Sequence, residues 1–349
     1  MKYNKIISSA LVCALISVML SGCFPTGEVS VPDSAPEIVE GITINAELPD
    51  NTPESAPQLT LRMREWDHDK LTEMLLDGKE ISRDNSKFDD QDGVMNYRYH
   101  TSDGGWLFFQ DGHIDYRSLY PSDQVSVSSY YGTTDMKALF PDEELEDFPK
   151  EDALKRVYEI IDKIELGREH LGEPQIYACT AEYANKLSSY IVRSEWTKDD
   201  EMYYIRIPVV YNGIPIIDRM FAVMGSSYSF SNGAYVDAVV IRTGVISFRC
   251  SSIFDEIKEQ GDDIPIKFSA EDAMNQFKNF FSEREFEPLT VVGCTLTYMP
   301  TSANSWQEYS FAPAWRIEYY TNPKDGMRPA PKRHIYNANT GVRILDYTG

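Results

Sequence analysis

The sequence predicts an α+β protein built from repeated units, each a helix packed on a curled antiparallel β-sheet. Segments with apolar residues at helical spacing occur three times, and each precedes segments with the period of β-strands. Turn signals such as Asp111-Gly112 and Asn212-Gly213 join successive strands, which indicates antiparallel hairpins. The second and third units also resemble each other: Glu-Asp-Ala opens both helices at residues 151 and 271, and Thr-Gly-Val follows at residues 243 and 340.

The three predicted helices each carry an apolar stripe and recognisable ends. The first spans Asp67–Asp77, with Asp67 as a favourable N-cap and a glycine directly after it. The second spans Lys150–Leu166. The third spans Ala270–Phe281, where Ser269 and Asp272 form a start that resembles a capping box. Because an apolar stripe must be buried, each helix is expected to lie on a sheet.

The predicted strands follow each helix in turn. The first group is Val94–His100, Trp106–Gln110 and His113–Leu119. The second group has the strongest strand pattern and comprises Tyr190–Trp196, Tyr203–Tyr211, Ile214–Val223, Ala234–Arg242 and Val245–Cys250. The third group comprises Leu289–Tyr298, Ala314–Tyr320, His334–Asn337 and Val342–Asp346. One further strand is expected within residues 41–48, where apolar and polar residues alternate.

The first 23 residues have the layout of a bacterial lipoprotein signal. Lys2 and Lys5 precede Ile6–Leu20, a run without a charged residue, and small residues then lead to Cys23. This pattern predicts cleavage before Cys23 and attachment of diacylglycerol to its thiol, which would hold the protein on the extracytoplasmic face of the cell membrane. The run is shorter than the roughly 20 residues of a membrane-spanning helix. A plain secretory signal cut elsewhere is the remaining alternative.

The composition divides the chain into five parts. Residues 1–22 are the expected signal peptide, and residues 23–57 are the lipidated cysteine with an acidic, Pro-rich tether. A helix and β-meander unit follows at 58–148. A second helix-plus-sheet unit covers 149–262, and a third covers 263–349.

The acidic balance of the chain restricts its partners. The formal net charge is −22, which repels the phosphates of nucleic acid and anionic lipid headgroups. We therefore expect no nucleic-acid partner, and we expect membrane attachment through the lipid anchor alone. Cationic partners are favoured, although a well-solvated extracellular surface is the simpler interpretation.

No residue set predicts catalysis, a metal site or a cofactor. The histidines are scattered, without a His-Glu-x-x-His pair, at His68, His100, His113, His170 and His334. His100 and His113 could meet across a sheet, but solvent-facing strand positions are the simpler interpretation. Residues 89–93 hint at a calcium loop, yet Phe88 and Tyr99 occupy its first and twelfth ligand positions. The chain has no Gly-x-Ser-x-Gly nucleophile motif and no phosphate-binding loop.

The cysteines and aromatic residues have structural and functional interpretations. Cys179, Cys250 and Cys294 remain beside Cys23, and an odd number does not form a disulfide framework. Buried free thiols are expected, with a Cys250–Cys294 pair as the alternative.

Tyrosine-rich bands could stack on sugars or contact a protein, but packing within the sheets is the simpler interpretation. The residues are Tyr116, Tyr120, Tyr130, Tyr131, Tyr203 and Tyr204.

Short motifs over about residues 150–349 resemble PepSY-type domains. Ser269–Ala273 is similar to their S-x-E-x-A helix entry, and Tyr211–Ile216 is similar to their Y-x-G-I-P-V strand. Ala314–Tyr319 and Ile335–Ile344 resemble their C-terminal ending. The region also resembles the YycH and YycI accessory regulators of a Firmicute cell-wall histidine kinase, and the whole layout resembles an uncharacterised lipoprotein family of Clostridia-like Firmicutes. The resemblance implies a helix-on-sheet fold without shared catalytic residues. The chain departs from YycH and YycI in its lipid anchor.

Together these observations predict a lipid-anchored extracytoplasmic binding or regulatory protein that is not an enzyme. Its expected partner is another envelope protein, such as a sensor or a peptidase. The alternative is a lipoprotein that captures a sugar or peptide for transport, and a cell-wall hydrolase is a third reading. An exposed apolar patch or a free sheet edge would favour a protein partner. A cleft lined by convergent polar groups would favour capture, and a buried pair of perturbed carboxylates would favour the hydrolase.

Overall fold

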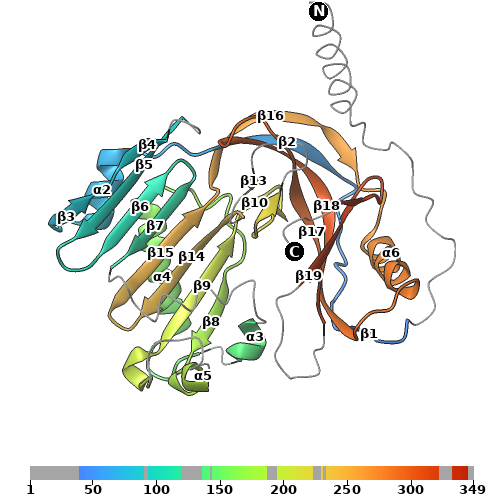
Figure 1. The fold of residues 1–349 in the computed structure, drawn as a ribbon, viewed down its shortest axis with the longest axis horizontal. Coiled ribbons are helices and arrows are strands. Elements are labelled where there is room, and N and C mark those ends of the chain that lie inside the picture. Colours follow the sequence, from blue (N-terminus) through green and yellow to red (C-terminus); the bar gives the residue numbers. More distant parts are fainter. Residues whose placement is uncertain are drawn as a thin grey trace, which may run out of the picture.

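The computed structural model describes residues 39–89, 93–118, 136–141, 144–186, 195–222, 229–230, 233–321 and 332–344. These residues form two large, mainly antiparallel sheets that lie side by side, and one of the two is strongly curled (Figure 1). Helices pack on the sheets, so the α+β prediction is confirmed. The expected signal peptide and Cys23 lie outside the described residues.

The larger sheet combines the strands of the first two predicted units. Its order is β3–β5–β6–β7–β15–β14–β9–β8, with β4 also paired to β5. The two halves join where β7 pairs with β15, for example Ile114 with Cys250. The strands are β3 (Ile81–Asp84), β4 (Lys87–Asp89), β5 (Val94–Thr101), β6 (Trp106–Gln110), β7 (His113–Arg117), β8 (Gln175–Cys179), β9 (Met202–Pro208), β14 (Tyr235–Ile241) and β15 (Gly244–Ser251).

The curled sheet has seven strands and contains the C-terminal part of the chain. Its path is β1–β17–β18–β19–β20, and β2 joins β18 to the outer strand β16. The short β1 runs parallel to β17, and the other pairs are antiparallel. The strands are β1 (Ile42–Ile44), β2 (Ser55–Met63), β16 (Phe254–Pro265), β17 (Leu289–Ala303), β18 (Glu308–Thr321), β19 (Lys332–Asn337) and β20 (Arg343–Ile344).

The junction between the sheets contains two small hairpins and an aromatic cluster. The hairpins are β10 (Val210–Tyr211) with β11 (Ile214–Pro215), and β12 (Phe221–Ala222) with β13 (Ser229–Phe230). Ile216 forms a bridge to Tyr298 of β17. Phe230, Phe254 and Phe311 pack ring to ring within 6.2 Å between centroids. The main hydrophobic core is therefore continuous across both sheets.

The three predicted helices are present, with small differences at their ends. Helix α2 (His68–Leu76) begins after Asp67, which accepts a hydrogen bond from the Lys70 N–H at 3.0 Å. Helix α4 (Lys150–Lys163) ends earlier than predicted. Helix α6 (Ala270–Ser282) starts with the predicted capping box of Ser269 and Asp272. Two short helices, α3 (Met136–Leu139) and α5 (Ala181–Lys186), and a 3-10 turn at Lys198–Asp200 were not expected.

Several strand predictions need correction. The predicted strand Ile214–Val223 is two short pieces, β11 and β12, which belong to separate hairpins, and the chain between them bonds to Tyr298 of β17 instead of continuing either ladder. Most of predicted strand Tyr190–Trp196 lies outside the described residues, and Trp196 itself is not in a strand. β2 begins at Ser55, inside the expected tether, and pairs with the C-terminal strands. Within the part of the chain that the structure describes, no helix is long and apolar enough to cross a membrane.

Candidate functional site

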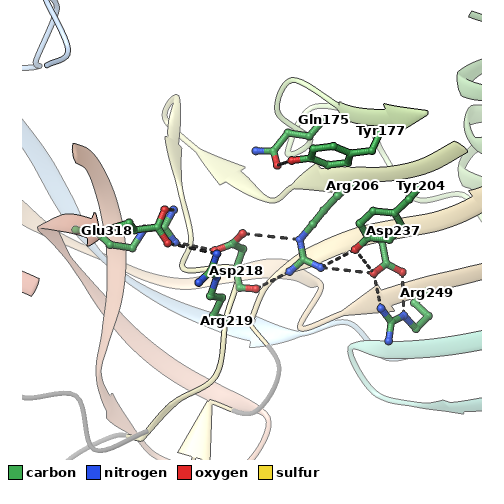
Figure 2. A network of polar contacts seen from close by, with 10 residues as sticks. Gln175, Tyr177, Tyr204, Arg206, Asp218, Arg219, Asp237, Arg249 and Glu318 are labelled. Carbon is green, nitrogen blue, oxygen red and sulfur yellow. Dashed lines mark hydrogen bonds and ion pairs between the residues drawn. The ribbon is translucent and has the colours of Figure 1, made fainter. Parts of the chain in front are cut away.

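A chain of buried charges crosses one face of the larger sheet (Figure 2). This face is opposite to the one that helix α4 covers, and we refer to it as the inner face. Arg206 of β9, Asp237 of β14 and Arg249 of β15 are direct cross-strand partners in the ladder. Their neighbours along each strand are apolar and face helix α4, so the alternation of side chains places the charges on the opposite face. Opposite charges on directly paired residues attract one another across the sheet.

Asp237 is held from three directions. Arg249 donates to both carboxylate oxygens, from Nε at 2.9 Å and from Nη2 at 2.5 Å. The Tyr204 hydroxyl donates at 3.0 Å, and Arg206 Nη1 approaches at 3.5 Å. Asp237 is only 2% exposed and Arg206 only 4%. A buried charge of this kind is stable only when it is paired and hydrogen bonded, as it is here.

The same chain of charges continues into the curled sheet. Arg206 donates to the Asp218 backbone carbonyl at 2.6 Å, and its Nε lies 3.8 Å from the Asp218 carboxylate. Asp218 in turn accepts from Arg316 of β18 at 2.7 Å, and Glu318 lies near both Arg316 and Arg219. The alternating charges therefore connect both sheets through Asp218 and Arg219, which lie between β11 and β12 (Figure 2).

Two tyrosines complete the network and stay protonated. The Arg206 guanidinium lies 3.5 Å from the centroid of the Tyr235 ring, a close cation–π contact. Burial, reinforced by the charge of Asp237, raises the pKa of Tyr204 and of Tyr235 above the usual range. Neither phenol is suited to act as a base. The hydrogen bonds and ion pairs of the network fix the orientation of these side chains.

A groove of about 320 Å³ lies beside Arg249 on this inner face. Asp115 forms a bidentate pair with Arg117, with N–O distances of 3.0 and 2.9 Å. Burial lowers the pKa of His113 to about 4, so its ring is neutral at pH 7. The groove is lined by Phe108, Gln110, His113, Ile114, Asp115, Tyr235, Arg249, Cys250 and Ser251. We refer to it as the inner groove.

A second groove lies on the outer face of the same sheet, between α2 and α4. It encloses about 540 Å³, and four partly exposed apolar side chains line it: Met74, Tyr116, Ile160 and Val245. Lys163 Nζ closes one side by donating to the Met74 carbonyl at 2.7 Å. We refer to it as the outer groove.

The structure does not bring the sequence-predicted candidates together. His100 pairs with Trp106 and His113 with Gln110, at opposite ends of the β5–β6–β7 meander, so the two histidines do not meet. Residues 90–92 of the suspected calcium loop lie outside the described residues. In the described ranges, no group of three or more His, Cys, Asp or Glu side chains is placed to hold a metal ion.

The structure agrees with the predictions for the three cysteines and for Tyr203 and Tyr204. Cys179, Cys250 and Cys294 are buried free thiols, as expected, and the alternative Cys250–Cys294 pair is not formed. Burial raises the pKa of all three, to about 12 for Cys294, so they are poor nucleophiles. Tyr203 and Tyr204 are fully buried, which confirms core packing for that band. Tyr120, Tyr130 and Tyr131 lie outside the described residues.

The sequence interpretation missed the buried network. Its signal was present, because Arg206 and Asp237 each interrupt a run of apolar residues in a predicted strand. A charge in the middle of such a strand requires an opposite charge nearby once the strand is buried. What could not be seen was which residues would supply it.

The chain was compared with known proteins. It matches no family model and no curated protein. It is similar in structure to a crystal structure of an uncharacterized protein from Eubacterium rectale, with a TM-score of 0.69 and 12% sequence identity. The alignment covers 88% of this chain and 92% of that chain. At this identity the likeness establishes a shared fold across nearly the whole of both chains, and nothing about function.

Proposed function

We propose that this chain is a lipid-anchored extracytoplasmic protein that binds and regulates another envelope protein and has no catalytic activity of its own. Two lines support the proposal. The lipoprotein signal ending at Cys23 indicates the location. The outer groove indicates the type of contact.

The outer groove is the observation that supports a protein as the binding partner. Met74, Ile160 and Val245 present apolar atoms in a wide, shallow depression. The cations beside it are already engaged, because Arg156 donates to the carbonyls of Ile241 and Arg242. Apolar surface between satisfied polar groups suits apolar side chains of a protein better than a small charged ligand.

The outer strand of the curled sheet argues against strand addition as the mode of contact. β16 carries several charged residues, and its pairing with β2 has three register irregularities. Charges and bulges on an outer strand oppose pairing with another chain. We therefore assign the contact to the helical face of the larger sheet.

The proposal includes a PepSY- or YycI-like repeat as the scaffold. Helix α4 lies on β9, β14 and β15, and α6 lies on β17 and β18. Two helices with similar openings thus each cover an antiparallel sheet, as the motif resemblance implies. This similarity supports a regulatory role by analogy with those families.

In-cell photocrosslinking tests the partner. We would replace Ile160 with p-benzoylphenylalanine in the full chain and use the same replacement at Glu271, an exposed residue of α6, as the control. We expect one envelope protein to be crosslinked from position 160, and the product to be lost when Met74→Asp is added. Equal products from both positions, or none from position 160, would contradict the proposal.

The location has a separate test. Cys23→Ala is expected to leave the precursor uncleaved or to release the protein from the membrane fraction. Intact-mass measurement and fractionation report each outcome. An unchanged mass and unchanged fractionation would refute lipidation at Cys23.

A second candidate function, capture of a small ligand, is favoured by the inner groove. Its volume lies at the lower end of the range of small-molecule sites, about 300–1,000 Å³, and polar groups converge on it. A hydrolase is not proposed. Hydrogen bonds lower the pKa of Asp84, Asp103 and Asp147, whereas a general acid needs an upward shift.

A further inference from the structure

We infer that the inner groove is a binding site for a neutral saccharide. The inference rests on the second candidate function, ligand capture, and gives that function a ligand class. It follows from four properties of the groove: its charge, its hydrogen-bonding groups, its aromatic wall and its place in the sheet.

The charges of the groove are internally neutralised. Arg249 is paired through two bonds with Asp237, and Asp115 is paired through two bonds with Arg117. Because each charge that lines the groove is already compensated by a bidentate partner, a charged ligand finds no uncompensated opposite charge there. The strongly acidic surface of the molecule also repels anions. A neutral ligand meets neither obstacle.

The groove nevertheless retains unused hydrogen-bonding capacity. Within the described part of the chain, Arg249 Nη1 and the Gln110 amide have no hydrogen-bond partner. His113 Nδ1 accepts from the Ser252 N–H at 3.4 Å, so the proton of the neutral ring lies on Nε2. Donors and acceptors therefore stand side by side, as the adjacent hydroxyl groups of a sugar require, because each hydroxyl both donates and accepts.

An aromatic ring forms one wall of the groove. Phe108 is stacked with Trp106 along the same strand, with centroids 6.1 Å apart and an angle of 13° between the rings. Arg98 lies over the Phe108 ring at 5.1 Å. A fixed apolar ring beside polar groups matches a sugar, which has C–H faces and a hydroxyl rim.

The position of the groove disfavours a peptide. Its floor is formed by β6, β7 and β15, and β7 and β15 are paired with neighbours on both sides. Their backbone N–H and C=O groups are already hydrogen bonded to neighbouring strands, so a peptide main chain cannot pair with them. Only side chains are left to recognise the ligand.

The buried network orients the groove for binding. Asp237 fixes the Arg249 guanidinium through two of its nitrogens, so the planar geometry of the group sets the direction of Nη1 (Figure 2). A preorganised donor loses little conformational entropy when a ligand binds. This supports binding in the groove without rearrangement of the sheet.

The test uses the full chain in a detergent without a sugar headgroup, so that the detergent does not compete. The neutral probes are maltotriose, cellotriose and tri-N-acetylchitotriose. Trigalacturonic acid and trialanine are the charged-sugar and peptide comparisons. Tryptophan fluorescence, to which Trp106 beside the groove contributes, and calorimetry measure binding.

We expect at least one neutral trisaccharide to bind with a Kd below about 1 mM, and Gln110→Ala to weaken it about tenfold. Phe108→Ala is expected to weaken it similarly. Gln260→Ala, which removes an exposed amide of β16, is the matched control and should leave Kd unchanged. Thermal melts verify that each variant is folded.

Three results would overturn the saccharide inference, and they differ in whether they also overturn ligand capture. If no probe binds at about 10 mM, ligand capture fails together with the saccharide. If trialanine or trigalacturonic acid binds and Gln110→Ala weakens it, capture stands and the saccharide assignment fails. If a neutral trisaccharide binds equally well to the Gln110→Ala and Phe108→Ala variants, the inner groove is not its site.

Discussion

Acid is expected to destabilise this protein through His334, which lies in an aromatic pocket of the curled sheet. The side chain is 4% exposed, and its ring contacts those of Phe277, Phe280, Phe281 and Tyr319. Its Nε2 accepts from Arg343 at 3.2 Å, and its Nδ1–H donates to the Tyr336 hydroxyl at 3.3 Å. This pattern requires a neutral ring.

Burial, reinforced by the positive charges of Arg343 and Arg284, lowers the pKa of His334 to about 3. In the unfolded chain the pKa is about 6.5, so between pH 6.5 and about 3 the unfolded state binds one more proton than the folded state. The free energy of unfolding therefore decreases as the pH falls through this window. At pH 5.0 the loss is about 2 kcal/mol, at about 1.36 kcal/mol per pH unit.

Urea denaturation at pH 7.0 and pH 5.0, followed by tryptophan fluorescence, measures this loss. His334→Gln keeps an acceptor for Arg343 but does not titrate, so its stability should fall by about 2 kcal/mol less than that of the unmodified protein between the two pH values. His100→Gln, on β5, is the control and should behave like the unmodified protein. A parallel loss in the His334→Gln variant would refute the reasoning.

Three further predictions concern the packing. Asp237→Asn removes the charge between two buried arginines, and urea denaturation should show a loss of about 3–5 kcal/mol; a loss below about 1 kcal/mol would contradict a tightly paired network. Gly233→Ala should prevent stable folding, because its backbone has a φ of +76° and a Cβ would lie 2.0 Å from the Asp218 carbonyl carbon. Gly213→Ala, with a φ of +75° and open space around it, is the matched control and should lose only about 1–2 kcal/mol. Trp315→Phe removes an indole donor that bonds the Phe268 carbonyl at 2.6 Å, and calorimetry should show a clear drop in Tm that Trp106→Phe on the inner face does not match.

Local signals in the sequence predicted the elements whose patterns are strong. The α4 and α6 stripes, the Ser269 capping box and the Asp111-Gly112 hairpin depend on neighbours a few residues apart, and all four are present in the structure. β16 was missed because its charges and glycine hide the strand period, and only pairing with β2 holds it extended. β8 was missed for a related reason: it is a short outer strand with little pattern of its own.

The candidate site shows the same division. The sequence contains Arg206, Asp237 and Arg249, but they are separated by many residues and no local rule joins them. They meet because β9, β14 and β15 pair in one register, and a shift of one residue would turn every one of these charges to the other face.

The sequence by itself predicted a lipoprotein signal at Cys23 and the α+β class, and it showed an acidic composition without a recognisable catalytic motif. These properties depend on composition and short-range pattern. Only the tertiary structure decided that the first two predicted units share one sheet, that the expected tether contributes to a C-terminal strand pair, and that charges from both sheets form one buried network. The physical reason is that strand pairing and charge burial join residues far apart in the chain. The spacing of residues along the sequence does not specify which strand or charge each of them contacts.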